Sequence, residues 1–156
     1  KPLYNRPLKG IYPPGSTYKP FMALAALETK KRTPAQTISD PGYFEFGNHT
    51  FRDDKKGGHG IVDMQKSIVE SCDTYYYLLA RDMGVNMMHD FMSPLGFGQK
   101  TGIDLEGEAA GILPSTENLA IEIWNQLCGP VAELGGLMHC VRVVETENNS
   151  VEYFGA

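Results

Sequence analysis

Ser16 and Lys19 are the first residues in this sequence whose types and spacing could do chemistry together. Residues three positions apart on a helix share one face, so these two side chains would be neighbours. A serine hydroxyl is a poor nucleophile until a base takes its proton, and a lysine kept partly neutral by burial can be that base. The pair indicates acyl transfer through a serine, although the spacing also fits a capping serine followed by a solvated lysine.

Four residues with metal-binding side chains lie in or next to an irregular stretch of the chain: Asp40, Asp53, His59 and Cys72. Carboxylate, imidazole and thiolate groups together suit tetrahedral zinc. A metal would explain how a segment with so little apolar content stays ordered. Each residue also has a local alternative, since Asp40 begins an Asp-Pro-Gly turn, Asp53 has basic neighbours and His59 lies between glycines. The residues alone leave both interpretations open.

The elements that must position these residues are expected to be mainly helical. Pro20 is tolerated only in a first helical turn, so the helix that carries Lys19 begins near Ser16. Residues 33–62 are rich in Gly, Pro, Asp and aromatic residues, which predicts a long connection without regular structure. A helix is expected over 63–70 with Asp63 as its N-cap, and another over 74–83 that ends at Gly84. A third is expected over 87–92 with Asn86 as its cap. A strand is expected only at 141–144.

Three long strings carry a resemblance to a known family. YNRPLKGIYPPGSTYKP resembles the start of the transpeptidase domain of class B penicillin-binding proteins, above all the elongation-specific penicillin-binding protein 2 group. GHGIVDMQKSIVESCDTYYYLLARDMG and FGQKTGIDLEGEAAGILPS extend the likeness, which covers about residues 1–115. It implies a partial transpeptidase domain of α+β class with an incomplete, serine β-lactamase-like fold, mostly its helical part with little sheet. Residues 116–156 are expected to be a divergent tail of unknown structure.

The resemblance also implies roles for the catalytic residues. Ser16 would be the acylated nucleophile and Lys19 its base. Ser71-Cys72-Asp73 resembles the family's S-x-N element in its S-x-D form. Ser71 would then help to relay a proton to the leaving amine, and Asp73 would support the lysine and the substrate amide. By itself, a Ser-x-Asp triplet is a common turn or helix cap.

The same likeness bears on the metal set. Some members resemble this sequence at all four positions, Asp40, Asp53, His59 and Cys72, and in them the set is associated with bound zinc. With four protein ligands such a site would be structural and closed, without a reactive water. No cofactor is implied for catalysis.

Lys100-Thr101-Gly102 spells K-T-G, the family's third motif, but the sequence around it does not predict a strand. The functional motif lies on a sheet-edge strand, whereas these residues stand among glycines inside the family's F-G-x-x-x-T-G-I-D-L-x-G-E loop. We expect Lys100 on a surface loop away from Ser16. The sequence contains no other K-[ST]-G. Beyond residue 115 the family has a tryptophan, an I-G-Q-G segment and then the K-[ST]-G strand, and only Trp124 resembles any part of this order. We therefore expect Ser16 to be acylated slowly or not at all.

Composition narrows the class of protein. At 156 residues, 42% hydrophobic and 21% charged, the chain suits a single small domain or part of a larger one. A net charge of −5 with scattered basic residues argues against nucleic acid as a partner. Three cysteines are too few for a disulfide framework, and the longest apolar run is too short to cross a bilayer. Since the chain opens on Lys1 with neither signal peptide nor anchor, we expect it to be a segment of a longer protein.

The function implied by the resemblance is that of a D,D-transpeptidase. It would cross-link peptidoglycan stem peptides that end in D-Ala-D-Ala, and β-lactams would acylate the same serine. The parent protein would act at the periplasmic face of the bacterial inner membrane, with a membrane glycan polymerase and the elongation-complex proteins that set cell shape. The alternatives are a non-catalytic β-lactam or peptide sensor, an inert fragment, and a β-lactamase, for which no water-activating base such as a Glu-x-x-x-Asn loop stands out. Tyr75, Tyr76 and Tyr77 are expected to pack, with one ring bordering a substrate groove as the alternative.

Overall fold

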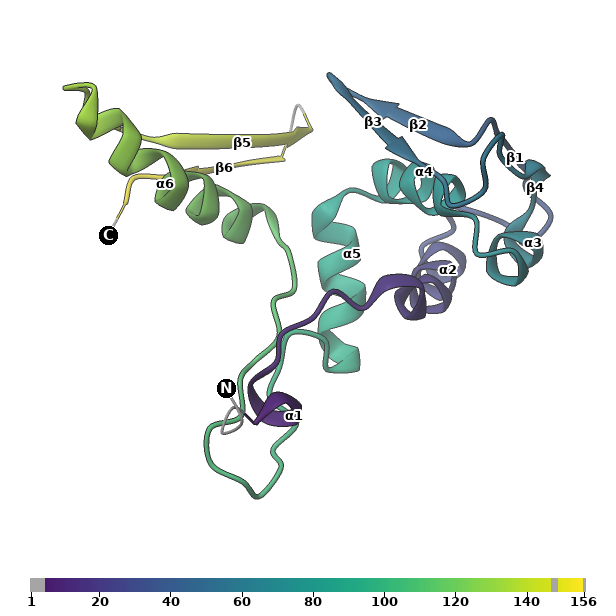
Figure 1. Ribbon diagram of the computed structural model, residues 1–156, viewed down its shortest axis with the longest axis horizontal. Helices are drawn as coiled ribbons and strands as arrows, with labels where there is room; N and C mark the ends of the chain where they lie inside the picture. Colours follow the sequence, from purple (N-terminus) through teal and green to yellow (C-terminus); the bar gives the residue numbers. More distant parts are fainter. Residues whose placement is uncertain (1–4, 147–148, 156) are drawn as a thin grey trace.

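The computed structural model describes residues 5–146 and 149–155, most of which lie in helices and the loops that join them (Figure 1). The helices are α1 (Arg6–Lys9), α2 (Lys19–Glu28), α3 (Met64–Val69), α4 (Asp73–Met83), α5 (Val85–Met92) and α6 (Thr116–Glu133), with short 3₁₀ turns η1 (Gly15–Tyr18) and η2 (Ser93–Leu95). The strands are β1 (Ile38–Asp40), β2 (Tyr43–Phe46), β3 (His49–Arg52), β4 (Gly60–Val62), β5 (Val141–Thr146) and β6 (Asn149–Tyr153). They pair as three separate antiparallel ladders, β1–β4, β2–β3 and β5–β6.

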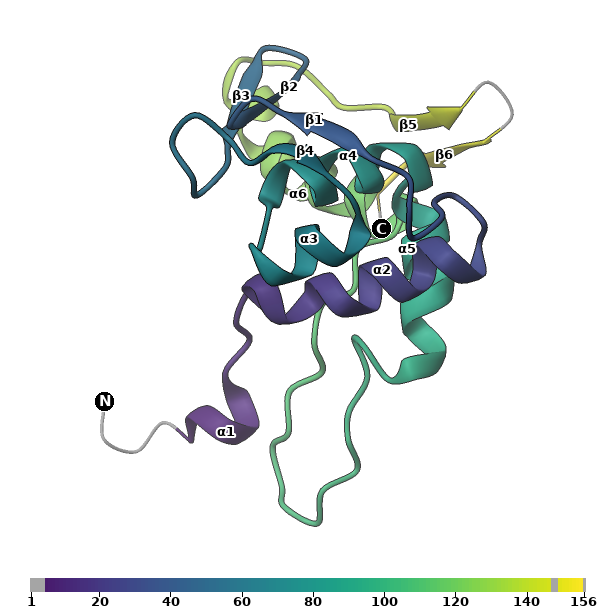
Figure 2. The ribbon, with the colours of Figure 1, turned by 90° about the vertical axis from the view of Figure 1, so that its right-hand side faces the viewer.

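The hydrophobic core lies between α2, α3, α4 and α5, which lie next to one another at the centre of Figure 2. Ala25 and Ala26 of α2 are fully buried, and such small side chains let a neighbouring helix approach closely. Leu79 and Tyr75 of α4 fill the centre of this core. The packing fixes α2, which begins at Lys19, against α4, which begins at Asp73.

Several predicted helix boundaries are confirmed. The 3₁₀ turn that holds Ser16 runs directly into α2, as Pro20 requires. Asp63 caps α3, because its side chain accepts a hydrogen bond of 2.8 Å from the Lys66 N–H. Gly84 ends α4 with φ of 75°, a value that glycine adopts without steric cost. These ends depend on local chemistry, which is why the sequence located them.

The prediction that residues 33–62 form a connection without regular structure is wrong. Four short strands lie there, with Ile38 opposite Val62 in one ladder and Phe44 opposite Phe51 in the other. Each strand has only three or four residues, too few for an alternating pattern to stand out. A strand does form at the predicted 141–144, as part of β5. The expectation of a single strand is wrong, because the four short strands show no alternating pattern in the sequence.

Asn86 does not cap α5, contrary to prediction, because α5 already begins at Val85. Its side-chain oxygen instead accepts hydrogen bonds from the Thr116 backbone N–H at 3.0 Å and the Thr116 hydroxyl at 2.6 Å. Thr116 is the first residue of α6, where backbone N–H groups have no partner within the helix. Asn86 therefore serves the start of a helix 30 residues away, which local spacing could not indicate.

The C-terminal part of the chain forms a unit of its own, in which α6 packs on the β5–β6 hairpin (Figure 1). Trp124 of α6 meets Tyr153 of β6 edge to face, with ring centroids 5.7 Å apart. Sequence patterning had predicted neither α6 nor its packing. Over the described residues, no helix combines the length and apolar character needed to cross a membrane.

An ion pair between Arg32 and Asp82 joins the loop after α2 to α4 and should make stability pH-dependent. Burial alone would raise the pKa of Asp82, but hydrogen bonds and positive charge from Arg32 and Arg81 lower it below its ordinary value. A lowered folded-state pKa adds stability above the unfolded pKa of about 4, and this stability is lost as pH falls through the folded pKa. We expect Asp82→Asn to cost about 1–2 kcal/mol at pH 7 and much less near pH 3.

Urea unfolding of both proteins across this pH range measures the effect. Asp104→Asn, on an exposed loop, is the matched control and should change stability little at any pH. An Asp82→Asn deficit that stays constant down to pH 3 would contradict the assignment.

Candidate active site

The four residues predicted from the sequence as catalytic come together in one hydrogen-bonded chain. Ser71 Oγ donates to Ser16 Oγ at 3.0 Å, and Lys19 Nζ donates to Ser71 Oγ at 2.9 Å. Lys19 Nζ also lies 2.5 Å from the Ser71 carbonyl oxygen and 2.6 Å from Asp73 Oδ1. Lys19 is only 9% exposed, so these partners replace the water that would otherwise solvate its amine.

Ser71 occupies an unusual backbone conformation at the turn between α3 and α4. Its φ of 55° lies in the left-handed region, which residues other than glycine rarely adopt and which tends to mark functional sites. Three hydrogen bonds hold this turn: Lys19 Nζ donates to the Ser71 carbonyl, the Cys72 N–H donates to the Ser67 carbonyl at 3.0 Å, and the Ser71 N–H donates to the Ile68 carbonyl at 3.3 Å. The turn presents Ser71 and Asp73 to Lys19 while Cys72 reaches the metal-candidate residues.

Tyr76 joins this site, although the sequence had favoured packing for it and left a ring at the substrate groove as the alternative. Its ring centroid lies 5.6 Å from Lys19 Nζ, within the range of a cation–π contact. The Tyr76 hydroxyl lies 3.2 Å from Ser67 Oγ, which donates in turn to the Met64 carbonyl at 2.7 Å. Tyr76 follows Asp73 by three positions on α4, and this spacing was the available signal that its ring would share the face of Asp73.

A cavity of about 290 Å³ opens beside the nucleophile candidate. Ser16, Lys19 and Asp73 supply its polar lining, whereas Met22, Tyr77 and other apolar side chains supply the rest. A small site with a few converging polar groups and apolar walls is the usual form of a ligand-binding cavity. The arrangement can bind a short peptide and deliver a serine hydroxyl to it.

The four metal candidates also converge, and all are buried: Asp40, Asp53, His59 and Cys72. Cys72 Sγ lies 3.5 Å from Asp40 Oδ2 and 3.4 Å from Asp53 Oδ2. His59 Nδ1 lies 2.8 Å from Asp40 Oδ2 and 3.3 Å from Asp53 Oδ1. Ligand atoms at zinc distances in a tetrahedron are roughly 3.3–3.8 Å apart, so the set is close to the spacing that a metal requires.

The electrostatics of this cluster also suit a cation. Burial would raise the pKa of Asp40 and of Asp53, but backbone hydrogen bonds, from Gly42 to Asp40 and from Thr74 to Asp53, lower both pKa values. Two carboxylates therefore stay ionised in a buried place. Burial, helped by these negative charges, raises the pKa of the Cys72 thiol to about 12, and a coordinated metal would reverse this by holding the thiolate. The donor set fits a divalent metal.

A close backbone approach brings His59 to the cluster. Gly58 has φ of 78°, and a Cβ at this position would lie 2.2 Å from the Asp40 carbonyl oxygen, so only glycine fits there. The His59 N–H then donates to Asp40 Oδ2 at 2.7 Å. With Nδ1 facing the carboxylates, His59 Nε2 lies 3.9 Å from Glu70 Oε2 and 4.0 Å from Asp54 Oδ1, beyond direct hydrogen-bonding distance.

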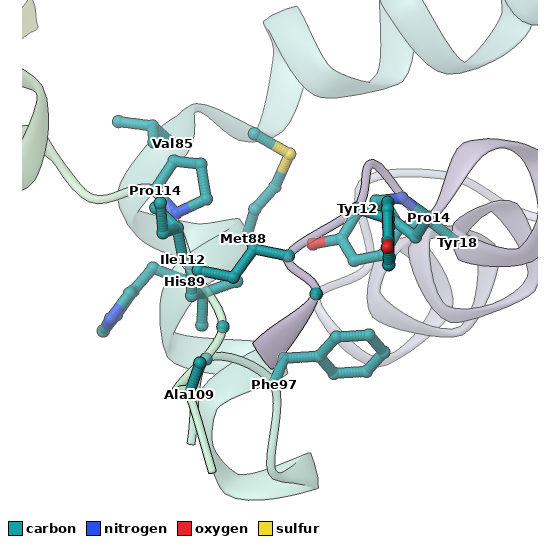
Figure 3. Close-up of a pocket in the computed structure, with 15 residues that line it drawn as sticks. Tyr12, Pro14, Tyr18, Val85, Met88, His89, Phe97, Ala109, Ile112 and Pro114 are labelled. Atoms are coloured by element: carbon teal, nitrogen blue, oxygen red, sulfur yellow. The ribbon is translucent and has the colours of Figure 1, made fainter. Parts of the chain in front are cut away.

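A second pocket, of about 500 Å³, lies between the segment before Ser16, helix α5 and the loop after η2 (Figure 3). Tyr12, Tyr18, Met88, Phe97 and Ile112 give it mainly apolar walls, and Ser16 is not among its lining residues. It shares Tyr18 and Met88 with the smaller cavity. We therefore place the candidate chemistry in the smaller cavity.

Comparison with known proteins settles the family. The profile of the penicillin-binding protein transpeptidase domain matches residues 1–127, most of the chain. This chain belongs to the penicillin-binding protein transpeptidase family. The fold class that the sequence predicted, a partial transpeptidase fold that is mostly helical with small sheets, is confirmed. The match runs 12 residues past 115 (127 − 115), and the predicted division of the chain there stays a prediction.

Similar proteins include the peptidoglycan D,D-transpeptidase MrdA of Acinetobacter baumannii, 53% identical over 119 residues, and that of Escherichia coli K12, 42% identical over 118. These stretches cover 75% and 74% of this chain but only 18% and 19% of the relatives, so the chain spans less than a fifth of their length. Among solved structures, Pseudomonas aeruginosa PBP2 in complex with WCK 5153 has a TM-score of 0.72 at 46% identity, covering 78% of this chain and 28% of that one.

Helicobacter pylori PBP2, solved in complex with MreC, also has a TM-score of 0.72, at 39% identity; the match covers 80% of this chain and 23% of that chain.

The K-T-G triplet, Lys100-Thr101-Gly102, does not form a strand in this structure. It lies in the loop after η2, where the N–H groups of Thr101 and Gly102 donate to Glu108 at 2.7 and 3.2 Å. Lys100 is exposed and does not line the cavity of Ser16, as predicted.

Proposed function

We propose that this chain carries the nucleophile half of a peptidoglycan D,D-transpeptidase site, in which Ser16 is acylated by a D-Ala-D-Ala stem peptide. One observation carries the proposal: Ser16, Ser71, Lys19 and Asp73 form a continuous hydrogen-bonded chain at the edge of a peptide-sized cavity. The names of the relatives, peptidoglycan D,D-transpeptidases, give the same reaction class.

The mechanism follows from the order of these groups. Ser71 Oγ stands between Ser16 Oγ and Lys19 Nζ, so a proton can leave Ser16 through Ser71 to Lys19 in its neutral form. Ser16 Oγ attacks the D-Ala-D-Ala carbonyl, the peptide bond breaks, and the relayed proton goes to the leaving D-alanine amine. An amine on the stem peptide of a neighbouring glycan strand then attacks the acyl carbon, the ester bond to Ser16 Oγ breaks, and the proton lost by the amine returns to Ser16 Oγ. Asp73 keeps the amine positioned, through a hydrogen bond while Lys19 is neutral and through an ion pair once it has taken the proton.

The acyl group must also be stabilised as negative charge develops on its oxygen. The Ser16 backbone N–H lies in the 3₁₀ turn and can donate one hydrogen bond, while a strand bearing K-[ST]-G would supply the other donor and bind the substrate carboxylate. Lys100-Thr101-Gly102 does not provide such a strand. A lost oxyanion donor costs about 10²–10³ in rate, so we expect this chain to acylate slowly.

For the buried cluster we propose zinc as the resident metal, held by Asp40, Asp53, His59 and Cys72. When bound, the ion supplies a closed structural cross-link and no reactive water. Cys72 lies between Ser71 and Asp73 in the sequence, so a thiolate fixed at the cluster would also fix the catalytic turn. The two carboxylates, imidazole and thiol within coordination spacing support this choice.

We further propose the setting of the parent protein. Its substrates would be peptidoglycan stem peptides, β-lactams would be its inhibitors, and it would work at the periplasmic face of the inner membrane. Its partners would be a membrane glycan polymerase and elongation-complex proteins of cell-shape control. Two similar structures support this choice, since one is a complex of PBP2 with MreC and the other is a peptidoglycan synthase complex that coordinates polymerization and crosslinking.

The proposal is tested by prolonged incubation of the chain with a reporter penicillin, followed by intact-mass and peptide mass spectrometry. We expect a slowly forming covalent adduct on Ser16 and none in Ser16→Ala. Thr17→Ala, next to the nucleophile and facing the Pro14 carbonyl through its hydroxyl, is the matched control and should label normally. An adduct on another residue, or equal labelling of Ser16→Ala, would contradict the proposed nucleophile, and rapid, stoichiometric labelling of Ser16 would contradict the expected slowness.

A further inference from the structure

Tyr77 stands between the serine cavity and the β2–β3 hairpin, and the mechanism above gives it no role. It lines the cavity from α4, four positions after Asp73 and so on the same helix face. Its ring centroid is 6.0 Å from that of Phe44, with ring planes 26° apart, and 5.6 Å from that of Phe51. One half-buried side chain therefore contacts both the cavity and the hairpin.

The hairpin presents an aromatic face to this tyrosine. Phe44 pairs with Phe51 and Phe46 with His49, and alternation along the strands puts all four on one face. Tyr43 pairs with Arg52 and lies on the opposite face. Figure 1 shows the hairpin lying over α4, the helix that carries Tyr77. Aromatic contacts of this kind hold two elements at a defined distance.

The base of the hairpin is tied to the buried cluster. β1 ends at Asp40, shortly before β2 begins, and Asp53 follows directly after β3. The Asp53 N–H donates to the Gly42 carbonyl at 3.0 Å, which closes the base of the hairpin. The hairpin is therefore anchored at its base and rests through Phe44 and Phe51 on Tyr77, so the ring of Tyr77 cannot swing outward without displacing them.

We infer that Tyr77 is a specificity-determining residue of the serine cavity, and that Phe44 and Phe51 are the positioning residues that hold it. The inference rests on the proposed function and names the group that Tyr77 meets: the methyl side chain of the D-alanine on the acyl side of the scissile bond. Beside the polar groups, Met22, Ala80 and Met88 line the cavity. Together with Tyr77 they form an apolar wall on which a methyl group can pack, and a branched side chain directed at this wall would have to displace the held ring.

The test follows binding to the chain by amide NMR, with N-acetyl-D-Ala-D-Ala and N-acetyl-D-Leu-D-Ala as probes and the signals of Ser16 and Ser71 as readout. The wild type should bind the D-Ala peptide more tightly. Tyr77→Ala should weaken binding of the D-Ala peptide about tenfold, since loss of an apolar wall has about this effect. It should also reduce the preference for the D-Ala peptide over the D-Leu peptide. Tyr77→Phe keeps the ring and should retain both affinity and preference.

Two hairpin variants separate positioning from general stability. Phe51→Ala should lower the preference for D-Ala without touching the cavity, whereas Tyr43→Ala on the opposite face should leave it unchanged. Phe51 is 39% exposed, so its variant keeps the fold and carries the test even if Tyr77→Ala unfolds. If the wild type binds but Tyr77→Ala and Phe51→Ala match it, this inference is overturned and the proposed function stands. If the wild type binds neither peptide, both are overturned.

Discussion

Loss of the Cys72 thiol is expected to release the metal and to lower the thermal stability of the chain more than any other single change considered. A metal that binds only the folded state adds about 4 kcal/mol at a free concentration of a thousand times its Kd. For a chain of this size that equals a rise in Tm of about 8–16 °C. We therefore expect Cys72→Ser to remove most of the stabilisation that the proposed zinc would give to the wild type, and to loosen the turn that holds Ser71 and Asp73.

The experiment combines metal analysis of the purified protein with thermal melts in zinc and in chelator. Cys128→Ser is the matched control, because Cys128 is exposed on α6 and is not part of the cluster. It should keep one zinc per chain and the wild-type Tm. A wild type that purifies without zinc, together with an unchanged Tm in Cys72→Ser, would rule out the site. In a parent protein, Cys72→Ser should also slow acylation of Ser16.

The second large effect is expected on the rate at which penicillin acylates Ser16, when Lys19 is replaced. Replacing it with methionine keeps most of the side-chain volume but removes the amine that hydrogen-bonds Ser71 and pairs with Asp73. General base catalysis contributes about 10²–10⁴ in rate, so Lys19→Met should slow penicillin acylation of Ser16 by this factor. Asp73 would then lose its partner in a half-buried place, and Tm should fall as well.

Lys100→Met is the matched control because it changes the same residue type within K-T-G. Lys100 lies on an exposed loop, so the acylation rate and Tm should stay at wild-type values. Rates for the three proteins come from time courses of adduct formation by intact-mass spectrometry. An equal slowing in both variants would show that Lys100 acts at the site and would restore the third motif.

The sequence determined those features that depend on neighbouring residues. Pro20 located the start of the helix that carries Lys19, Asp63 capped α3, and Gly84 ended α4, because proline, a capping carboxylate and glycine each act on their own turn of backbone. The i, i+3 relation of Ser16 and Lys19 was visible for the same reason. Residue types also named the metal candidates, but by themselves they left local roles open, and the family resemblance favoured the metal.

The tertiary structure decided everything that depends on residues far apart in the sequence. Strands of three or four residues have no readable period, so only pairing revealed the β1–β4 and β2–β3 ladders around the cluster. The left-handed Ser71 is held by Lys19, 52 positions away, and no local propensity favours it. Tyr76 over Lys19 and Tyr77 against Phe44 are likewise contacts between segments that only the packing of α4 brings together. Local rules fix backbone turns, whereas burial and pairing between distant segments fix the site.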